Sequence, residues 1–133
     1  MRQSSRMVGE TEGMTIQIKR AYEPASDSDG CRVLVDRLWP RGVSKERAHL
    51  DSWLKEVAPS PELRTWWRHD PERMEEFALR YRAELDGDPL TVTAVAALRA
   101  LVARGPATLV YGAKDPHVNH ARLLAEYLAE SPA

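Results

Sequence analysis

The run CRVLVD at positions 31–36 combines β-branched and aliphatic residues with almost no polar interruption. Such a run is typical of a strand that is buried on both faces, in the middle of a covered sheet. It leads directly into RLWPRG at positions 37–42, where Pro40 and Gly42 prevent the strand from continuing. The segment therefore predicts an interior strand with an arginine-rich exit.

Two other segments have the character of strands. Residues 15–20 alternate apolar and polar side chains, and residues 107–111 (ATLVY) are again of the short buried type. Residues 44–57 fit either a helical face or a break near His49 followed by a short strand. Helices are predicted where a capping residue precedes proline, at Ser60-Pro61, Asp70-Pro71, Asp88-Pro89 and Asp115-Pro116.

This alternation of buried strands and amphipathic helices predicts an α/β domain with a short, mostly parallel sheet covered by helices on both faces. The 133 residues, of which 43% are hydrophobic and 29% charged, suit one ordinary globular domain. We expect residues 1–13 to form a disordered lead-in and residues 14–130 to form the single domain.

The charge and cysteine content exclude several classes of protein. With 19 basic and 20 acidic residues the net charge is -1, so an anion site must be local rather than a field of the whole protein. One cysteine allows no internal disulfide and gives no metal-binding cysteine pattern. The sequence has no apolar run long enough for a membrane span and no apolar core of a secretory signal near its start, so we expect a cytoplasmic protein.

Polar and basic residues gather at two strand exits. The first is residues 36–42, with Lys45 close behind, and the second is residues 111–120, which join a strand to a capped helix. Ligands of open α/β sheets bind beyond the carboxyl ends of the strands, and two parallel neighbouring strands would bring both exits to one edge. The residues that we expect to bind a ligand there are Arg37, Trp39, Arg41, Lys45, Lys114 and Asn119.

The chemistry of these exits suits a small ligand that carries phosphate or carboxylate. A guanidinium offers a planar fork of donors to such groups, the start of a helix attracts anions, and Trp39 can stack on a base or ring. Asp36 could orient an arginine or act as a base, and His120 is the second candidate for a catalytic role. A structural interpretation is equally consistent with the residues: Asp36 and Arg37 would pair and fix the loop, while Trp39 would fill the core.

Other candidate sites favour a structural interpretation. His117 and His120 are three residues apart, but no third ligand of suitable spacing is evident, so no metal site is predicted. Cys31 opens a buried strand and suits a small core residue. Trp66 and Trp67, flanked by Arg64 and Arg68, suit the core better than a stacking platform for nucleic acid. No glycine-rich phosphate loop and no hydrolase or zinc-protease motif occurs, and no cofactor is expected.

Two further functions stay open at this point. A nucleic-acid accessory protein would use Lys19, Arg20, Arg32 and residues 41–45 as a basic patch, although the near-zero net charge weighs against it. A non-catalytic protein-interaction domain would use its arginines and tryptophans to hold loops. Burial of Arg37 and Arg41 against carboxylates and carbonyls would favour this last function.

Several stretches resemble the YeaO-like branch of the domain-of-unknown-function family 488. They cover residues from about Ile16 to Leu128 and are KRAYEP at 19–24, DGCRVLVDRLWPRG at 29–42, WLKEVAPSPELR at 53–64 and TLVYGAKD at 108–115. The resemblance implies a small, Rossmann-like, three-layer domain with no established activity and no established cofactor. It also implies that the family pattern includes Asp36, Arg37, Trp39, Arg41, Lys114 and Asp115, without giving them roles.

The resemblance includes one departure. Much of the broader family carries Cys-His-Arg where this sequence has Asn119, His120 and Ala121. Cysteine-based or metal-based chemistry of longer relatives is therefore not carried over to this chain.

Overall fold

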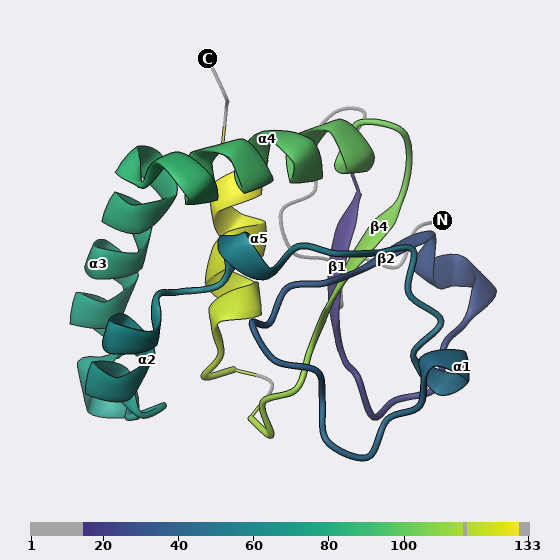
Figure 1. Ribbon diagram of the computed structural model, residues 1–133, viewed down its shortest axis with the longest axis horizontal. Helices are drawn as coiled ribbons and strands as arrows, with labels where there is room; N and C mark the ends of the chain where they lie inside the picture. Colours follow the sequence, from purple (N-terminus) through teal and green to yellow (C-terminus); the bar gives the residue numbers. More distant parts are fainter. Residues whose placement is uncertain (1–14, 116, 131–133) are drawn as a thin grey trace, which may run out of the picture.

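Four parallel strands form the sheet of this protein, in the spatial order β1-β4-β2-β3, and Figure 1 labels three of them, β1, β4 and β2. The computed structural model describes residues 15–115 and 117–130, so the lead-in predicted at residues 1–13 lies outside the described residues. The strands are β1 (Ile16–Arg20), β2 (Cys31–Leu34), β3 (Ser52–Trp53) and β4 (Ala107–Tyr111). The prediction of a short, mostly parallel sheet is confirmed.

Helices account for most of the remaining chain. The α-helices of the described residues are α1 (Lys45–Ala48), α2 (Pro61–Trp67), α3 (Met74–Gly87), α4 (Pro89–Val102) and α5 (His120–Ala129). Short 3-10 helices occur at Asp27–Asp29, Lys55–Val57 and Pro71–Arg73. Over residues 15–115 and 117–130, no helix combines the length and the apolar character needed to cross a membrane.

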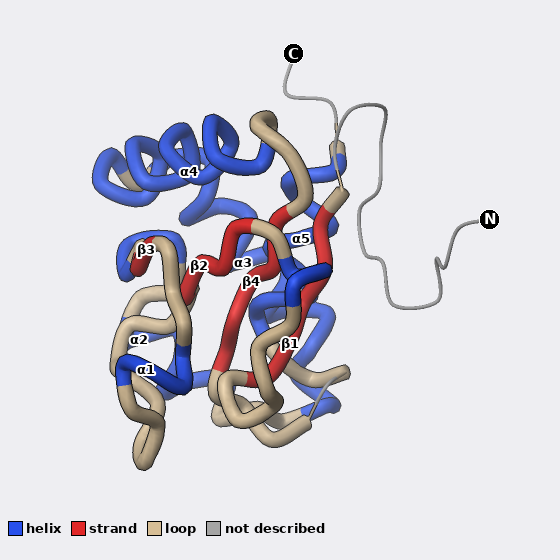
Figure 2. Tube along the Cα trace, turned by 90° about the vertical axis from the view of Figure 1, so that its right-hand side faces the viewer, coloured by secondary structure: helices blue, strands red, loops and turns tan. Residues whose placement is uncertain are grey.

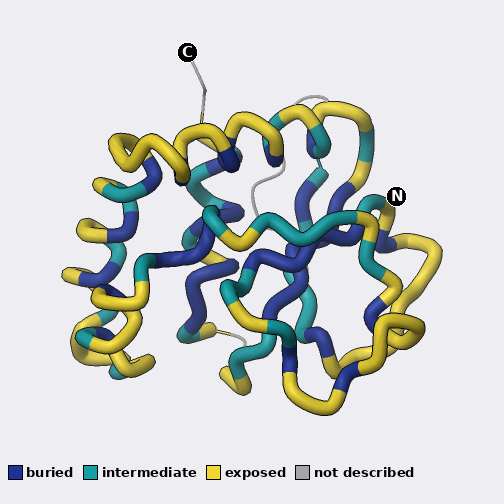
Figure 3. The backbone as a smooth tube through the Cα atoms, viewed as in Figure 1, coloured by how far each residue is buried: buried dark blue, intermediate teal, exposed yellow. Residues whose placement is uncertain are grey.

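Successive side chains of a strand point to opposite faces of the sheet, so each face has its own apolar cluster. The two clusters differ in size. Val33 and Leu109 lie in the main core, which includes Phe77 of α3, Leu98 of α4 and Leu124 of α5. On the other face a smaller apolar cluster lies against α1 and the loop before it, and its buried members are Ala21, Leu34, Val43, Ala48 and Val110. All of β4 is buried, as Figure 3 shows, which matches the prediction of an interior strand.

The strand order decides where a ligand can bind. Strand β4 pairs with β1 on one side and with β2 on the other (Figure 2). Because all three strands are parallel, the segments that follow them leave the sheet at the same edge. The two exits singled out in the sequence are therefore neighbours in space, and the exit of β1 joins them.

The ambiguous segment at residues 44–57 adopts the second of its two alternatives. Helix α1 is a single turn that ends at His49, whose backbone is left-handed (φ 51°) and whose N–H bonds to the carbonyl of Lys45. The carboxylate of Asp51 then accepts the N–H of Arg32 at 2.8 Å, and β3 pairs with β2. The short strand β3 is the fourth strand of the sheet.

The last helix begins later than predicted. Asp115 does not cap α5; its carboxylate instead accepts the N–H groups of His117 and Val118 in a tight turn. The cap is Asn119, whose side-chain oxygen accepts the N–H of Arg122 at 2.9 Å. The prediction that the helix starts after Asp115 was wrong because two good capping residues lie four positions apart, and the second one takes the role.

Candidate functional site

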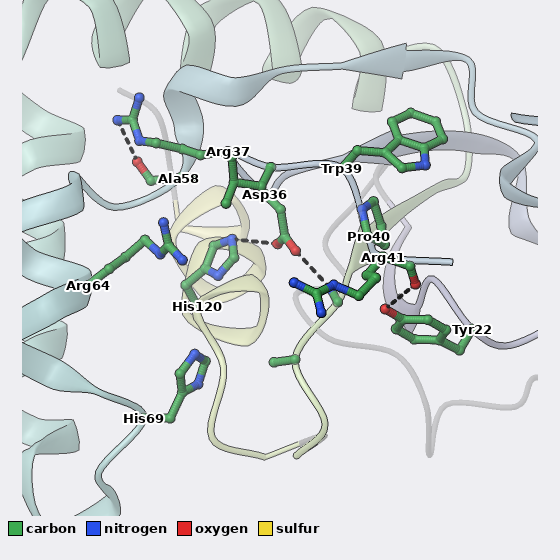
Figure 4. Close-up of a pocket in the computed structure, with 13 residues that line it drawn as sticks. Tyr22, Asp36, Arg37, Trp39, Pro40, Arg41, Ala58, Arg64, His69 and His120 are labelled. Carbon is green, nitrogen blue, oxygen red and sulfur yellow. Dashed lines mark hydrogen bonds and ion pairs between the residues drawn. The ribbon is translucent and has the colours of Figure 1, made fainter. Parts of the chain in front are cut away.

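A pocket of about 250 Å³ lies beyond the carboxyl ends of β1, β2 and β4 (Figure 4). Residues from six separate segments form its wall: the exits of the three strands, the loop before α2, helix α2 with the turn that follows it, and the start of α5. The lining residues are Tyr22, Asp36, Arg37, Leu38, Trp39, Pro40, Arg41, Ala58, Arg64, His69, Gly112, Ala113 and His120.

Asp36 and His120 form the inner wall of the pocket. One oxygen of Asp36 accepts the backbone N–H of Gly112 at 2.9 Å, which ties the exit of β2 to the exit of β4. The other oxygen, Oδ1, lies 3.4 Å from Nε2 of His120. A side chain at position 112 would crowd this contact, since a Cβ there would lie 3.1 Å from the Asp36 oxygen.

The ring of His120 is held in one orientation. Its Nε2 lies 2.9 Å from the carbonyl oxygen of Val35, so we assign the Nε2 proton to this bond. In the neutral ring Nδ1 is then a hydrogen-bond acceptor, and it becomes a donor when the ring is protonated. The ring also packs edge-on against Tyr81 of α3.

Burial lowers the pKa of His120 below its ordinary value, and the nearby His69 and Arg64 act in the same direction. The carboxylate of Asp36 and the hydrogen bond to Val35 oppose this shift without reversing it. The ring is therefore neutral at pH 7. An anion placed beside it would stabilise its protonated form.

Arg41 and Arg64 line the pocket from different parts of the chain. Arg41 follows β2, Arg64 lies on α2, and both side chains are exposed. In the view of Figure 4 the two guanidinium groups extend toward His120 from opposite sides. Within residues 15–115 and 117–130, neither guanidinium makes a hydrogen bond or an ion pair, and the bond at Arg41 is accepted by its backbone oxygen from Tyr22.

Arg37 and Trp39 are anchored to the protein itself. The guanidinium of Arg37 donates to the carbonyls of Pro59 at 3.0 Å and Ala58 at 3.2 Å. The indole of Trp39 donates to the carbonyl of Val43 at 2.6 Å, and Figure 4 shows the ring turned away from His120. Both residues line the pocket, but the polar atoms named here already have partners.

The other predicted ligand-binding residues lie elsewhere. Lys45 borders a second hollow beside Trp53 and does not line the pocket. Lys114 is exposed and outside the lining. Asn119 is fully buried and serves as the cap of α5, with its amide nitrogen donating to the carbonyl of Asp115 at 3.0 Å. The structure thus brings together Asp36, Arg37, Trp39, Arg41 and His120, and it does not bring Lys45, Lys114 or Asn119 to them.

Two residues of the pocket had no assigned role in the sequence interpretation. Arg64 was considered only as a neighbour of Trp66 and Trp67, and His69 was not considered. They follow no strand; Arg64 lies on α2, and His69 lies in the turn after α2, where its Nδ1 is 3.4 Å from the carbonyl oxygen of Val118. His69 lies in a turn with left-handed backbone (φ 57°), which ends α2 and directs the chain back toward the pocket. That turn carries no local motif for a binding site.

Three residues of the basic patch considered for nucleic acid have partners in the structure, whereas Arg41 and Lys45 of the same patch are exposed. Arg32 is buried, with its Nη1 2.7 Å from Asp29 and its Nε bonded to the carbonyl of Ala48. Lys19 pairs with the same carboxylate at 3.1 Å, and Arg20 donates to the carbonyl of Ala113. These three residues therefore have partners within the molecule, and the nucleic-acid function stays a prediction.

The chemical groups at the pocket are limited. Among the described residues that line it there is no cysteine, serine, threonine or lysine. In the part of the chain that the structure describes, no three His, Cys, Asp or Glu residues lie close enough to hold a metal ion. The wall offers three guanidinium groups, two imidazoles, one carboxylate and several apolar side chains.

Comparison with known proteins gives a consistent family. The family described as "Inactive DUF488-N3 subclade" matches residues 15–133. The chain is 44% identical over 115 residues to the uncharacterised protein YeaO of Escherichia coli K12, covering 86% of this chain and 97% of that protein. It is 43% identical over 122 residues to an uncharacterised protein of Mycobacterium tuberculosis H37Rv, covering 92% and 98% respectively. No solved structure matches the chain.

Proposed function

Because this chain belongs to the inactive DUF488-N3 subclade of the DUF488 family, we propose that its pocket binds a small phosphate- or carboxylate-bearing ligand without converting it. The observation that supports this proposal best is that one pocket has on its wall the guanidinium groups of Arg41 and Arg64, neither of which has a partner among the described residues. Each offers a planar fork of donors that matches the oxygens of phosphate or carboxylate.

The charge around the pocket supports the same ligand class. Three arginines and one carboxylate line it, which leaves a positive balance before the two histidines are counted. The pocket lies next to the amino end of α5, a ten-residue helix whose dipole favours negative charge there.

Binding without turnover fits the side chains available. Covalent catalysis commonly uses cysteine, serine, threonine or lysine as the nucleophile, and the described lining has none of these four residue types. Asn119, at the position where much of the broader family has cysteine, is buried and occupied in capping α5. The pair of Asp36 and His120 then has the role of positioning: it joins β2, β4 and α5 and orients one ring nitrogen.

The test is a titration of the full chain with inorganic phosphate and, separately, with acetate. Binding is monitored through the backbone amide signals of Gly112 and Ala113 in NMR spectra. We expect both signals to move, and we expect Arg41→Gln and Arg64→Gln each to weaken the better-bound anion at least about tenfold, the loss of a charged hydrogen bond. Arg47→Gln is the matched control, since Arg47 is an exposed arginine outside the lining.

Two results would contradict the proposal. One is the absence of binding by inorganic phosphate and acetate and also by larger organic molecules that carry a phosphate or carboxylate group. The other is binding that Arg41→Gln and Arg64→Gln weaken no more than Arg47→Gln does.

A further inference from the structure

We infer that the ligand carries its anionic group on an aromatic ring, with the anion at Arg41 and Arg64 and the ring against Leu38 and Tyr22. This inference rests on the proposed function and adds the part of the ligand that the cations do not recognise. A ligand of this kind is expected to bind more tightly than an inorganic anion or a small hydrophilic acid.

The distribution of exposed apolar side chains is the first support. Five large hydrophobic residues are exposed in the described chain, and two of them, Leu38 (68% exposed) and Tyr22 (37%), line this one pocket. The other three lie on α3 and α4 and are Leu79, Leu90 and Val92. A single exposed leucine is ordinary on a protein surface. Here two exposed apolar residues line the same pocket as two arginines without partners among the described residues, so the pocket offers both an apolar and a cationic surface to a ligand.

The second support is that the chain around Leu38 and the side chain of Tyr22 are both anchored. Leu38 lies between Arg37 and Trp39, whose side chains are anchored to backbone carbonyls. The hydroxyl of Tyr22 donates to the carbonyl of Arg41 at 2.9 Å, and the guanidinium of Arg20 lies 4.9 Å from the ring centroid. A surface held in place before binding loses less conformational entropy when a ring packs on it.

The size of the pocket is the third support. At about 30 Å³ for each water molecule, 250 Å³ corresponds to about eight water molecules. This is below the range of about 300–1,000 Å³ that is usual for drug-sized ligands. A phosphate or carboxylate group alone would leave much of this space unfilled, whereas an anionic group attached to one ring would occupy it. A larger body would extend out past the exposed side chain of Leu38.

The test compares matched pairs of probes on the full chain by NMR titration at neutral pH: phenyl phosphate against inorganic phosphate, and benzoate against acetate. We expect the ring to strengthen binding about tenfold or more in at least one pair, which is about 1.4 kcal/mol. The pair with the larger effect shows whether the anionic group is phosphate or carboxylate. Leu38→Gln should reduce the advantage of the ring to less than about threefold, which is about 0.65 kcal/mol. The same substitution should leave the affinity for the ring-free anion unchanged.

Leu79→Gln is the matched control, because Leu79 is 64% exposed on α3 and outside the pocket. If the ring-bearing probes bind no better than their ring-free partners, or if Leu38→Gln acts no more than Leu79→Gln, the inference is overturned while anion binding stands. If no probe binds, the proposed function fails as well. Binding of phenyl phosphate or benzoate alone, sensitive to Leu38, supports the inference.

Discussion

Arg32 and Arg41 belong to one stretch of chain, the first within β2 and the second in its exit, but their surroundings are opposite. Arg32 is 2% exposed and pairs with Asp29, while Lys19 binds the same carboxylate. Arg41 is exposed on the wall of the pocket, and its guanidinium has no partner among the described residues. The comparison teaches that the type of residue does not decide whether an arginine stabilises the fold or recognises a ligand. The partners brought by the tertiary structure decide it.

The largest expected effect is at the buried cluster of Asp29, Lys19 and Arg32. Asp29→Asn leaves the buried guanidinium of Arg32 without its counter-charge, and removing one partner of a buried pair costs about 3–5 kcal/mol. We expect a loss of this size in the free energy of unfolding, measured by urea denaturation. The neighbouring exposed Asp27 gives the control, since Asp27→Asn should change stability by no more than about 0.5 kcal/mol. Equal effects of the two substitutions would show that Arg32 does not depend on this carboxylate.

The same cluster predicts a loss of stability in acid. Burial works to raise the pKa of Asp29, but hydrogen bonds from Ser26, Lys19 and Arg32 outweigh it and hold the pKa below its ordinary value. The contribution of Asp29 is therefore present above the unfolded pKa and is lost as the pH falls through the folded pKa. Wild-type protein should show this acid-dependent loss, and Asp29→Asn should lack this part of it.

A smaller effect separates Arg37 from Arg41, the two arginines of the β2 exit. Arg37→Gln removes donors to two backbone carbonyls and should lower the free energy of unfolding by about 1.5–3 kcal/mol. Its effect on phosphate affinity should be no more than about fivefold, the size of a screened charge. Arg41→Gln should do the reverse, with little change in stability and at least about a tenfold loss of affinity. Denaturation and titration of the same two variants check both halves.

The opposite result would contradict this distinction: Arg37→Gln would lower the anion affinity, and Arg41→Gln would lower the stability. A stable Arg37→Gln protein that had lost its anion affinity would make Arg37 the binding arginine. The anchoring of its guanidinium by Ala58 and Pro59 would then be a resting arrangement that the ligand replaces.

The smallest effect concerns His120, which is buried like Arg32 but lines the pocket like Arg41. Burial lowers the pKa of this imidazole, so the unfolded chain takes up a proton first as the pH falls below about 6.5. Stability should therefore decrease between that pH and the folded pKa, by about 1.4 kcal/mol for each unit of difference. His120→Gln should flatten the stability profile in this range, whereas His117→Gln, at an exposed position, should leave it unchanged. A profile that His120→Gln does not alter would contradict the assignment of a neutral ring.

The features that could be predicted from the sequence are those with a local cause. The apolar run at residues 31–34 and the Pro40 and Gly42 that follow it identify an interior strand and its exit. The same holds for β4, and two buried parallel strands are enough to place both exits at one edge. The pocket was therefore located correctly, although its membership was incomplete.

The features that escaped prediction have tertiary causes. Arg64 and His69 enter the pocket because the tertiary structure places α2 and the turn after it beside the strand exits, and no motif in α2 signals that position. In the sequence Arg32 cannot be distinguished from the other basic residues. In the structure its guanidinium donates to the carboxylate of Asp29 and to the carbonyl of Ala48. The start of α5 depended on a competition between Asp115 and Asn119, two residues with similar capping ability.

The central claim is that the pocket beyond β2 and β4 binds an oxyanion through Arg41 and Arg64. The most direct measurement is a crystal structure of the full chain soaked in selenate, whose anomalous scattering locates the ion. We expect a peak inside the pocket within hydrogen-bond distance of at least one of the two guanidinium groups, and its loss in the double variant Arg41→Gln/Arg64→Gln. An empty pocket in crystals that hold selenate elsewhere, or a peak that survives in the double variant, would contradict the claim.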